Sequence, residues 1–165
     1  MFNLKNKKVV LKRKFVTNLA LLLFLNLLVK PFWIFGIDRE VQNVVGSQEY
    51  GLYFSLFSLS LMLNILLDIG IINFNNRSIA RDNSLLKDHL AKIIPIKFTL
   101  AIFYAVIVLI IGFTLNYSAR QFDLLIILIV NQFLLSFILY LRSNISGLHY
   151  FKTDSLISVL DRLLM

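Results

Sequence analysis

Long apolar runs separated by short polar segments dominate this chain. Four runs are long enough to cross a bilayer as helices, at about residues 15–36, 50–69, 94–116 and 122–141. An α-helix rises about 1.5 Å per residue, so roughly 20 apolar residues match the ~30 Å hydrocarbon core of a membrane. A fifth run begins near Ser155 and reaches Met165 before it is long enough to cross. The pattern predicts an all-α fold, a polytopic transmembrane helix bundle.

The connections between these runs are short and contain no linker rich in Pro, Gly or Ser. Residues 1–165 are therefore expected to form one partial transmembrane domain, the front part of a longer protein. The longest connection, residues 73–95, alternates apolar and charged positions at nearly helical spacing, which predicts an amphipathic segment whose apolar side faces the bilayer boundary. Pro95 then suits the first turn of the third helix, where its missing N–H costs nothing.

Polar side chains inside the predicted spans recur at helical spacing. In lipid such side chains need a partner or a water-filled cavity, so a polar face indicates what that face contacts. On the second helix one face carries a stripe that becomes more polar toward its cytoplasmic end: Tyr53, Phe57, Ser60, Asn64 and Asp68. On the fourth helix one face carries Gln132, Ser136, Tyr140 and Ser143, and on the first helix one face carries Asn26 and Lys30. The third helix is nearly uniform and is expected to be the most lipid-exposed. The pattern favours a bundle around a hydrophilic interior, with ordinary interhelical hydrogen bonding as the alternative.

Two charged side chains near span ends each allow two interpretations. Asp68 either is a helix-end acid, solvated by headgroups or paired with Arg77, or belongs to the polar interior. Lys30 either extends its long stem to the membrane surface or points into a hydrated cavity.

Positive charge is unevenly distributed along the chain. The sequence has 17 Lys and Arg against 9 Asp and Glu, a formal net charge of +8, while 58% of its residues are hydrophobic. The cations are concentrated before residue 15, between residues 77 and 97, and after residue 141. Because cytoplasmic loops retain Lys and Arg, this distribution predicts a multi-pass membrane protein with a cytoplasmic N-terminus. It accounts for the basic charge without a nucleic acid partner.

Residues that support catalysis or metal binding are scarce. The chain has no cysteine, which excludes disulfides, thiolate nucleophiles and cysteine metal sites. His89 and His149 have no second ligand nearby in the sequence, and no phosphate-binding loop or hydrolase motif occurs. We therefore expect no metal, no cofactor and no enzymatic activity, unless a catalytic site lies beyond Met165.

The stretch "FGIDREVQNVVGSQEYGLYFSLFSLSLMLNILLDIGIINFNNRSIAR", followed later by "GLHYFKTDSLISVLDRLLM", carries a family likeness. Its features are the ordered set Gly46, Tyr50, Gly51, Asp68, Gly70, Arg77 and Arg81. The chain resembles the N-terminal part of bacterial polysaccharide flippases of the multidrug/oligosaccharidyl-lipid/polysaccharide exporter superfamily. The likeness covers essentially all 165 residues.

The resemblance implies twelve to fourteen helices in two related halves. Such a protein moves an oligosaccharide on a polyprenyl pyrophosphate carrier, for example an O-antigen unit, across the inner membrane by alternating access. Its partners would be this lipid-linked oligosaccharide, membrane lipids and the polysaccharide polymerase machinery. The roles it implies are a cytoplasmic funnel for the anionic headgroup (Arg77, Arg81, Arg142), a substrate path (Asn26, Lys30, Ser60, Asn64, Gln132), and ion coupling or an ion pair with Arg77 (Asp68).

Three other functions remain open. A drug or cation exporter of the same superfamily would need a more acidic cavity, and Lys30 argues against it. A non-transporting scaffold of a polysaccharide assembly complex fits a short chain. A membrane glycosyltransferase or polymerase would need grouped acids or arginines further along the sequence.

Overall fold

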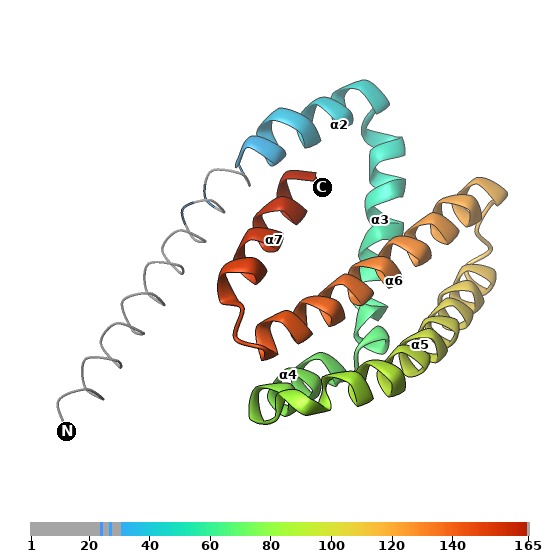
Figure 1. Ribbon diagram of the computed structural model, residues 1–165. Helices are drawn as coiled ribbons and strands as arrows, with labels where there is room; N and C mark the ends of the chain where they lie inside the picture. The colour runs from blue at the N-terminus through green and yellow to red at the C-terminus, as the bar shows by residue number, and fades with distance from the viewer. Residues whose placement is uncertain (1–23, 25–26, 28–30, 165) are drawn as a thin grey trace. The chain divides into compact units, whose positions relative to one another are not determined.

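The computed structural model describes residues 24, 27 and 31–164, and every regular element among them is a helix (Figure 1). This confirms the predicted all-α fold. The chain divides into two compact units, residues 1–44 with 151–165, and residues 45–150. The elements are η1 (Trp33–Asp38), α2 (Arg39–Val45), α3 (Ser47–Leu63), η2 (Asn64–Leu67), α4 (Ile71–Arg81), η3 (Asn83–Leu85), α5 (Leu86–Thr114), α6 (Ala119–Gly147) and α7 (Phe151–Leu164).

The first unit contains η1, most of α2, and α7. Most of the predicted first span, residues 15–36, lies outside the described residues. Helical structure continues beyond residue 36 to Val45, with π-type bonding over Trp33–Asp38. The last helix begins at Phe151, earlier than the expected start near Ser155.

The second unit contains three helices that are long and apolar enough to cross a membrane, counted within the described part of the chain. They are Ser47–Leu67, Asn83–Thr114 and Ala119–Gly147. They correspond to the predicted runs 50–69, 94–116 and 122–141. This length and composition are consistent with a membrane protein.

Helix α5 begins at Leu86, so the expectation that Pro95 lies in a first turn is wrong. Pro95 lies inside the helix, where it removes one backbone hydrogen bond. The preceding turns remain helical because they pack against neighbours: Ile93 is buried, and His89 contacts α4. The segment expected at the bilayer boundary therefore packs partly inside the protein, and Ile79 is also buried.

The second predicted span does not continue as one α-helix to residue 69. After Leu63 the chain tightens into the 3-10 segment η2, and Ile69 and Gly70 then adopt positive φ angles of 43° and 83°. Glycine adopts this left-handed conformation without the steric cost that other residues bear. The carboxylate of Asp68 accepts a hydrogen bond from the backbone N–H of Ile72, 3.1 Å away, and so caps the start of α4. The chain changes direction here and begins a new helix.

A hydrophobic core joins α3, α5 and α6. Its buried members are Leu56, Leu67, Tyr104, Val108, Leu125, Leu128 and Ile129. Figure 1 shows α5 and α6 joined by a short connection and running in opposite directions. Gly112 lets them approach near this connection, because a Cβ there would lie 3.1 Å from Cε1 of Phe122. A capping box of Ser118 and Gln121 fixes the start of α6.

The amphipathic helix α4 packs against the last turns of α6. A Cβ added at Gly147 would lie 3.0 Å from Cβ of Ile79 and 3.2 Å from the carbonyl oxygen of Asn76. The glycine therefore allows the two helices to approach closely. This contact leaves the opposite side of α4 available for the site described next.

Candidate functional site

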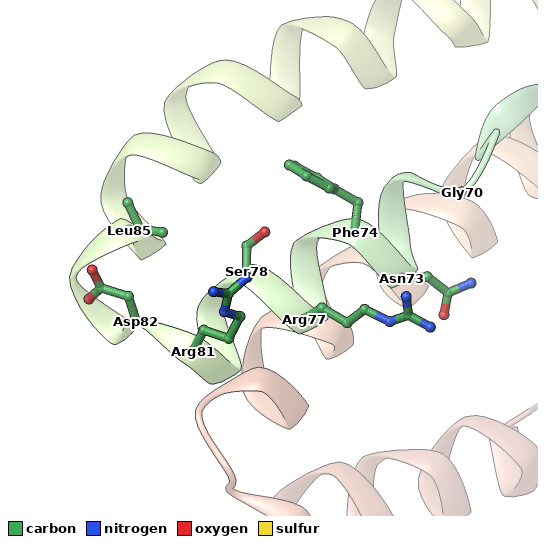
Figure 2. A pocket seen from close by; sticks show the side chains of 8 residues that line it. All are labelled: Gly70, Asn73, Phe74, Arg77, Ser78, Arg81, Asp82 and Leu85. Atoms are coloured by element: carbon green, nitrogen blue, oxygen red, sulfur yellow. The ribbon is translucent and has the colours of Figure 1, made fainter.

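A pocket of about 830 Å³ lies along α4 and the turn that follows it (Figure 2). Its volume is in the range of sites that hold small molecules or headgroups. The residues that line it are Gly70, Asn73, Phe74, Arg77, Ser78, Arg81, Asp82 and Leu85. All belong to the second unit, and most recur at intervals of three or four residues, so one face of α4 forms most of the wall.

Two arginines on this wall give the pocket its positive charge. Arg77 and Arg81 are exposed and one helical turn apart, so their guanidinium groups emerge from the same side of α4 (Figure 2). Like charges at this spacing repel each other, and an anion between them removes that penalty. Each guanidinium presents a planar set of donors that matches phosphate oxygens. The arrangement therefore suits a phosphate-bearing group.

The remaining walls are mixed in character. Phe74 and Leu85 supply apolar surface, while Asn73 and Ser78 supply amide and hydroxyl groups suited to sugar or glycerol hydroxyls. Asp82 carries negative charge at the end of α4. Its carboxylate accepts hydrogen bonds from the hydroxyl of Ser84 (2.7 Å) and from its backbone N–H (2.9 Å). These bonds lower the pKa of Asp82 below its ordinary value of 3.8, so it remains charged near neutral pH.

A buried polar network holds the pocket wall from behind. The ring of Phe74 stacks on His89 of α5 with centroids 5.7 Å apart and planes 8° apart. Nδ1 of His89 lies 3.0 Å from Oδ1 of Asn75, which is fully buried. Nδ2 of Asn75 donates to Oδ1 of Asn144 (2.8 Å) and to Oγ of Ser143 (3.0 Å). Both amide hydrogens are thereby used, so Nδ1 of His89 is the donor to Asn75.

An ion pair with Arg77 was one of the alternatives for Asp68, and the structure shows a different partner. Among the described residues, the salt bridge of Asp68 is with Lys97 of α5, at 3.1 Å, and the side chain of Lys97 is only 1% exposed. The chain stops being a continuous α-helix before Asp68, because Asn64–Leu67 form a 3-10 segment. The proposed role of Asp68 in ion coupling stays a prediction.

Three predicted path residues lie together inside the second unit. Nδ2 of Asn64 donates to Oε1 of Gln132, and Nε2 of Gln132 donates to Oγ of Ser60 at 3.5 Å. Ser60 and Gln132 are fully buried, and the hydroxyl of Tyr104 donates to the carbonyl of Ser60 at 3.0 Å. The contacts here are interhelical hydrogen bonds, the alternative considered from the sequence. A role in a substrate path stays a prediction.

Of the predicted headgroup residues, the structure brings Arg77 and Arg81 together in one pocket. Arg142 lies on α6 and is not among the lining residues of that pocket, so its grouping with the other two is not found there. Asn26 and Lys30 lie outside the described residues.

Sequence reasoning missed two polar groups on α5. Lys97 was grouped with the cations of the connection before the third helix, although it lies between Ile96 and Phe98, inside the apolar run expected to begin at residue 94. A cation in such a run needs buried acceptors, and this was the available signal. Tyr104 is also fully buried, so one face of this nearly uniform helix packs inside the second unit.

Comparisons with protein-family models, with curated protein sequences and with solved structures find no match to this chain.

Proposed function

We propose that this chain is part of a membrane transporter that moves a lipid-linked oligosaccharide across the bacterial inner membrane. On this proposal the pocket on α4 receives the anionic pyrophosphate of the carrier lipid. The observation that carries the proposal is the pair Arg77 and Arg81 in one pocket, next to helices long enough to span a bilayer. The sequence resemblance to polysaccharide flippases supports the same class.

The chemistry of the pocket suits each part of such a headgroup. The two guanidinium groups match the phosphates, and charge-assisted hydrogen bonds of this kind contribute about 1.5–3 kcal/mol each. Asn73 and Ser78 offer partners for sugar hydroxyls, and Phe74 offers an apolar surface for a sugar ring. The polyprenyl tail stays in the hydrocarbon, along the exposed apolar faces of the spanning helices.

The distribution of cations supports an orientation for the proposed transporter. Arg77 and Arg81 lie in the pocket between the first and second spans of the second unit, and Lys87 and Lys92 follow in the N-terminal part of the second span. By the tendency of Lys and Arg to remain in the cytoplasm, we infer that the pocket opens on the cytoplasmic side. A headgroup synthesised in the cytoplasm would meet the pocket there.

A cation exporter is less well supported. The carboxylate it would use, Asp68, is already paired with Lys97. This pairing neutralises the acid that such an exporter would need in its cavity.

Binding of a polyprenyl pyrophosphate to the chain in micelles tests the proposal. Arg77→Gln and Arg81→Gln are each expected to weaken binding about tenfold or more, because each removes charge-assisted hydrogen bonds. Arg120→Gln is the matched control, since Arg120 is an exposed arginine paired with Glu49 outside the pocket. In a complete transporter, the double variant Arg77→Gln/Arg81→Gln should reduce surface polysaccharide without affecting membrane insertion. Normal export, or equal weakening by Arg120→Gln, would refute the proposal.

A further inference from the structure

The ammonium group of Lys97 is held by three oxygen atoms, which come from the end of η2, the turn that follows it and α6. Nζ of Lys97 lies 2.9 Å from the carbonyl oxygen of Leu67, 2.9 Å from Oγ of Ser136 and 3.1 Å from Oδ1 of Asp68. The lysine side chain is 1% exposed and that of Asp68 is 25% exposed. We call the Leu67 carbonyl, the Asp68 carboxylate and the Ser136 hydroxyl the oxygen cradle.

The cradle is available because the helix breaks at this point. In a continuous α-helix the carbonyl of Leu67 would accept a bond from the N–H of residue 71. Here the N–H of Ile71 instead donates to the carbonyl of Asp68 at 2.9 Å. The Leu67 carbonyl accepts from Lys97 and, at 3.3 Å, from Ser136. Because the Ser136 hydrogen points at Leu67, its lone pairs face the ammonium.

One carboxylate, one carbonyl freed by a helix break and one hydroxyl form the ligand set of a monovalent-cation site. Transport proteins coordinate such ions with backbone carbonyls at breaks in their helices. A surface salt bridge would need only the carboxylate. The two neutral oxygens at 2.9 Å solvate the charge in place of water, which offsets the penalty of burying it.

We propose that the oxygen cradle is a monovalent-cation site whose resident cation is the chain's own Lys97 ammonium. On this assignment the α3–α4 break is stabilised by a tethered cation and does not depend on dissolved Na⁺ or K⁺. Shortening Lys97 to alanine converts the cradle into a site for an external cation of the same chemistry. Methylammonium fits best, because its ammonium head replaces Nζ and its methyl group enters the space left by the lysine stem.

Thermal unfolding of the full chain in detergent micelles tests this assignment. Wild-type protein should melt at the same temperature in methylammonium, potassium and choline chloride at matched ionic strength. Lys97→Ala should melt lower, and methylammonium at about ten times its Kd should raise its melting temperature by about 5 °C, saturably, relative to choline. Choline carries the same charge but is too large for the cradle and has no N–H donors.

Three further variants separate the cradle from general effects. Adding Ser136→Ala or Asp68→Asn to Lys97→Ala should abolish the methylammonium response. Lys92→Ala, which removes an exposed lysine of the same helix, should match wild type in every salt. The proposal is overturned if choline raises the melting temperature of Lys97→Ala as much as methylammonium does. It is also overturned if the methylammonium effect persists after Ser136→Ala and after Asp68→Asn are added.

If Lys97→Ala folds poorly, a second measurement still tests the proposal. The folded yield of Lys97→Ala is then compared between growth media that contain methylammonium or choline. A higher yield with methylammonium supports the cradle, and equal yields overturn it. The proposal does not rest on anion binding at Arg77 and Arg81, which the polyprenyl pyrophosphate assay measures separately.

Discussion

Replacing Asn75 with alanine tests whether the buried polar network holds α4 in place. Asn75 is fully buried and connects three side chains: it donates to Ser143 and Asn144, and it accepts from His89. Alanine removes all three bonds at once. Oδ1 of Asn144 and Nδ1 of His89 then lose the partner that the structure gives them.

The expected loss follows from this bond count. Interhelical hydrogen bonds in membrane proteins contribute about 0.6 kcal/mol on average and up to about 1.7 kcal/mol. Ser143 retains its bond to the carbonyl of Tyr140 at 2.7 Å, so its hydroxyl remains satisfied. Three lost bonds together with two stranded groups give about 2–4 kcal/mol. For a chain of this length that corresponds to a fall of about 5–15 °C in melting temperature.

Thermal unfolding in micelles measures the effect, with Asn73→Ala as the matched control. Asn73 is an exposed asparagine on the same helix, so its replacement should shift stability by no more than about 0.5 kcal/mol. Equal melting temperatures for the two variants would refute the idea that the network anchors α4 to α6. Asn75→Asp should be worse than Asn75→Ala, because a buried carboxylate offers no N–H donors to Ser143 and Asn144.

Two further predictions concern close packing and local charge. Gly147→Ala should destabilise the chain by about 1–3 kcal/mol in thermal unfolding, because the added Cβ would lie 3.0 Å from Cβ of Ile79. Gly51→Ala is the control: a Cβ there has nothing within 4 Å, so the change should be neutral or stabilise the chain by up to about 1 kcal/mol. Equal effects of the two substitutions would contradict this prediction. Ser84→Ala should raise the pKa of Asp82 toward 3.8, measured by carboxyl ¹³C titration. Since the folded-state pKa of Asp82 is depressed, its contribution to stability is present above 3.8 and is lost as the pH falls below that value. An unchanged titration midpoint would show that the Ser84 hydroxyl does not lower the pKa of Asp82.

The all-α fold was predictable because apolar runs of bilayer length leave few other structures possible. The break after Leu67 was not, since it depends on a short 3-10 segment and two residues with positive φ. A glycine at position 70 is compatible with a break but does not require one. The early start of α5 was also missed, because Pro95 suggested a first turn while tertiary contacts extend the helix before it.

The candidate site was predictable in part. The family resemblance implied that Arg77 and Arg81 act at one site, and the structure places both in one pocket. The polar face of α6 was also visible from spacing, and Gln132 and Ser136 are buried as members of it. The partner of Asp68 was not predictable, because Lys97 lies 29 residues away in the sequence and was grouped with the cations of the connection before the third helix. Pairing of side chains across helices depends on how the helices cross, which spacing within one helix does not reveal.

The level of the helix break determines how far α5 and α6 project from a membrane. Bonds from Lys97 and Ser136 place these residues level with Leu67. Residues 97–114 and 119–136 each extend about 27 Å, close to the ~30 Å of a hydrocarbon core. On the proposal that these helices span a bilayer, residues 86–96 and 137–147 form about three turns each that stand in the headgroup layer and water. An anion bound at Arg77 therefore never leaves the aqueous interface, and its carrier lipid needs to tilt only its polar end to reach it.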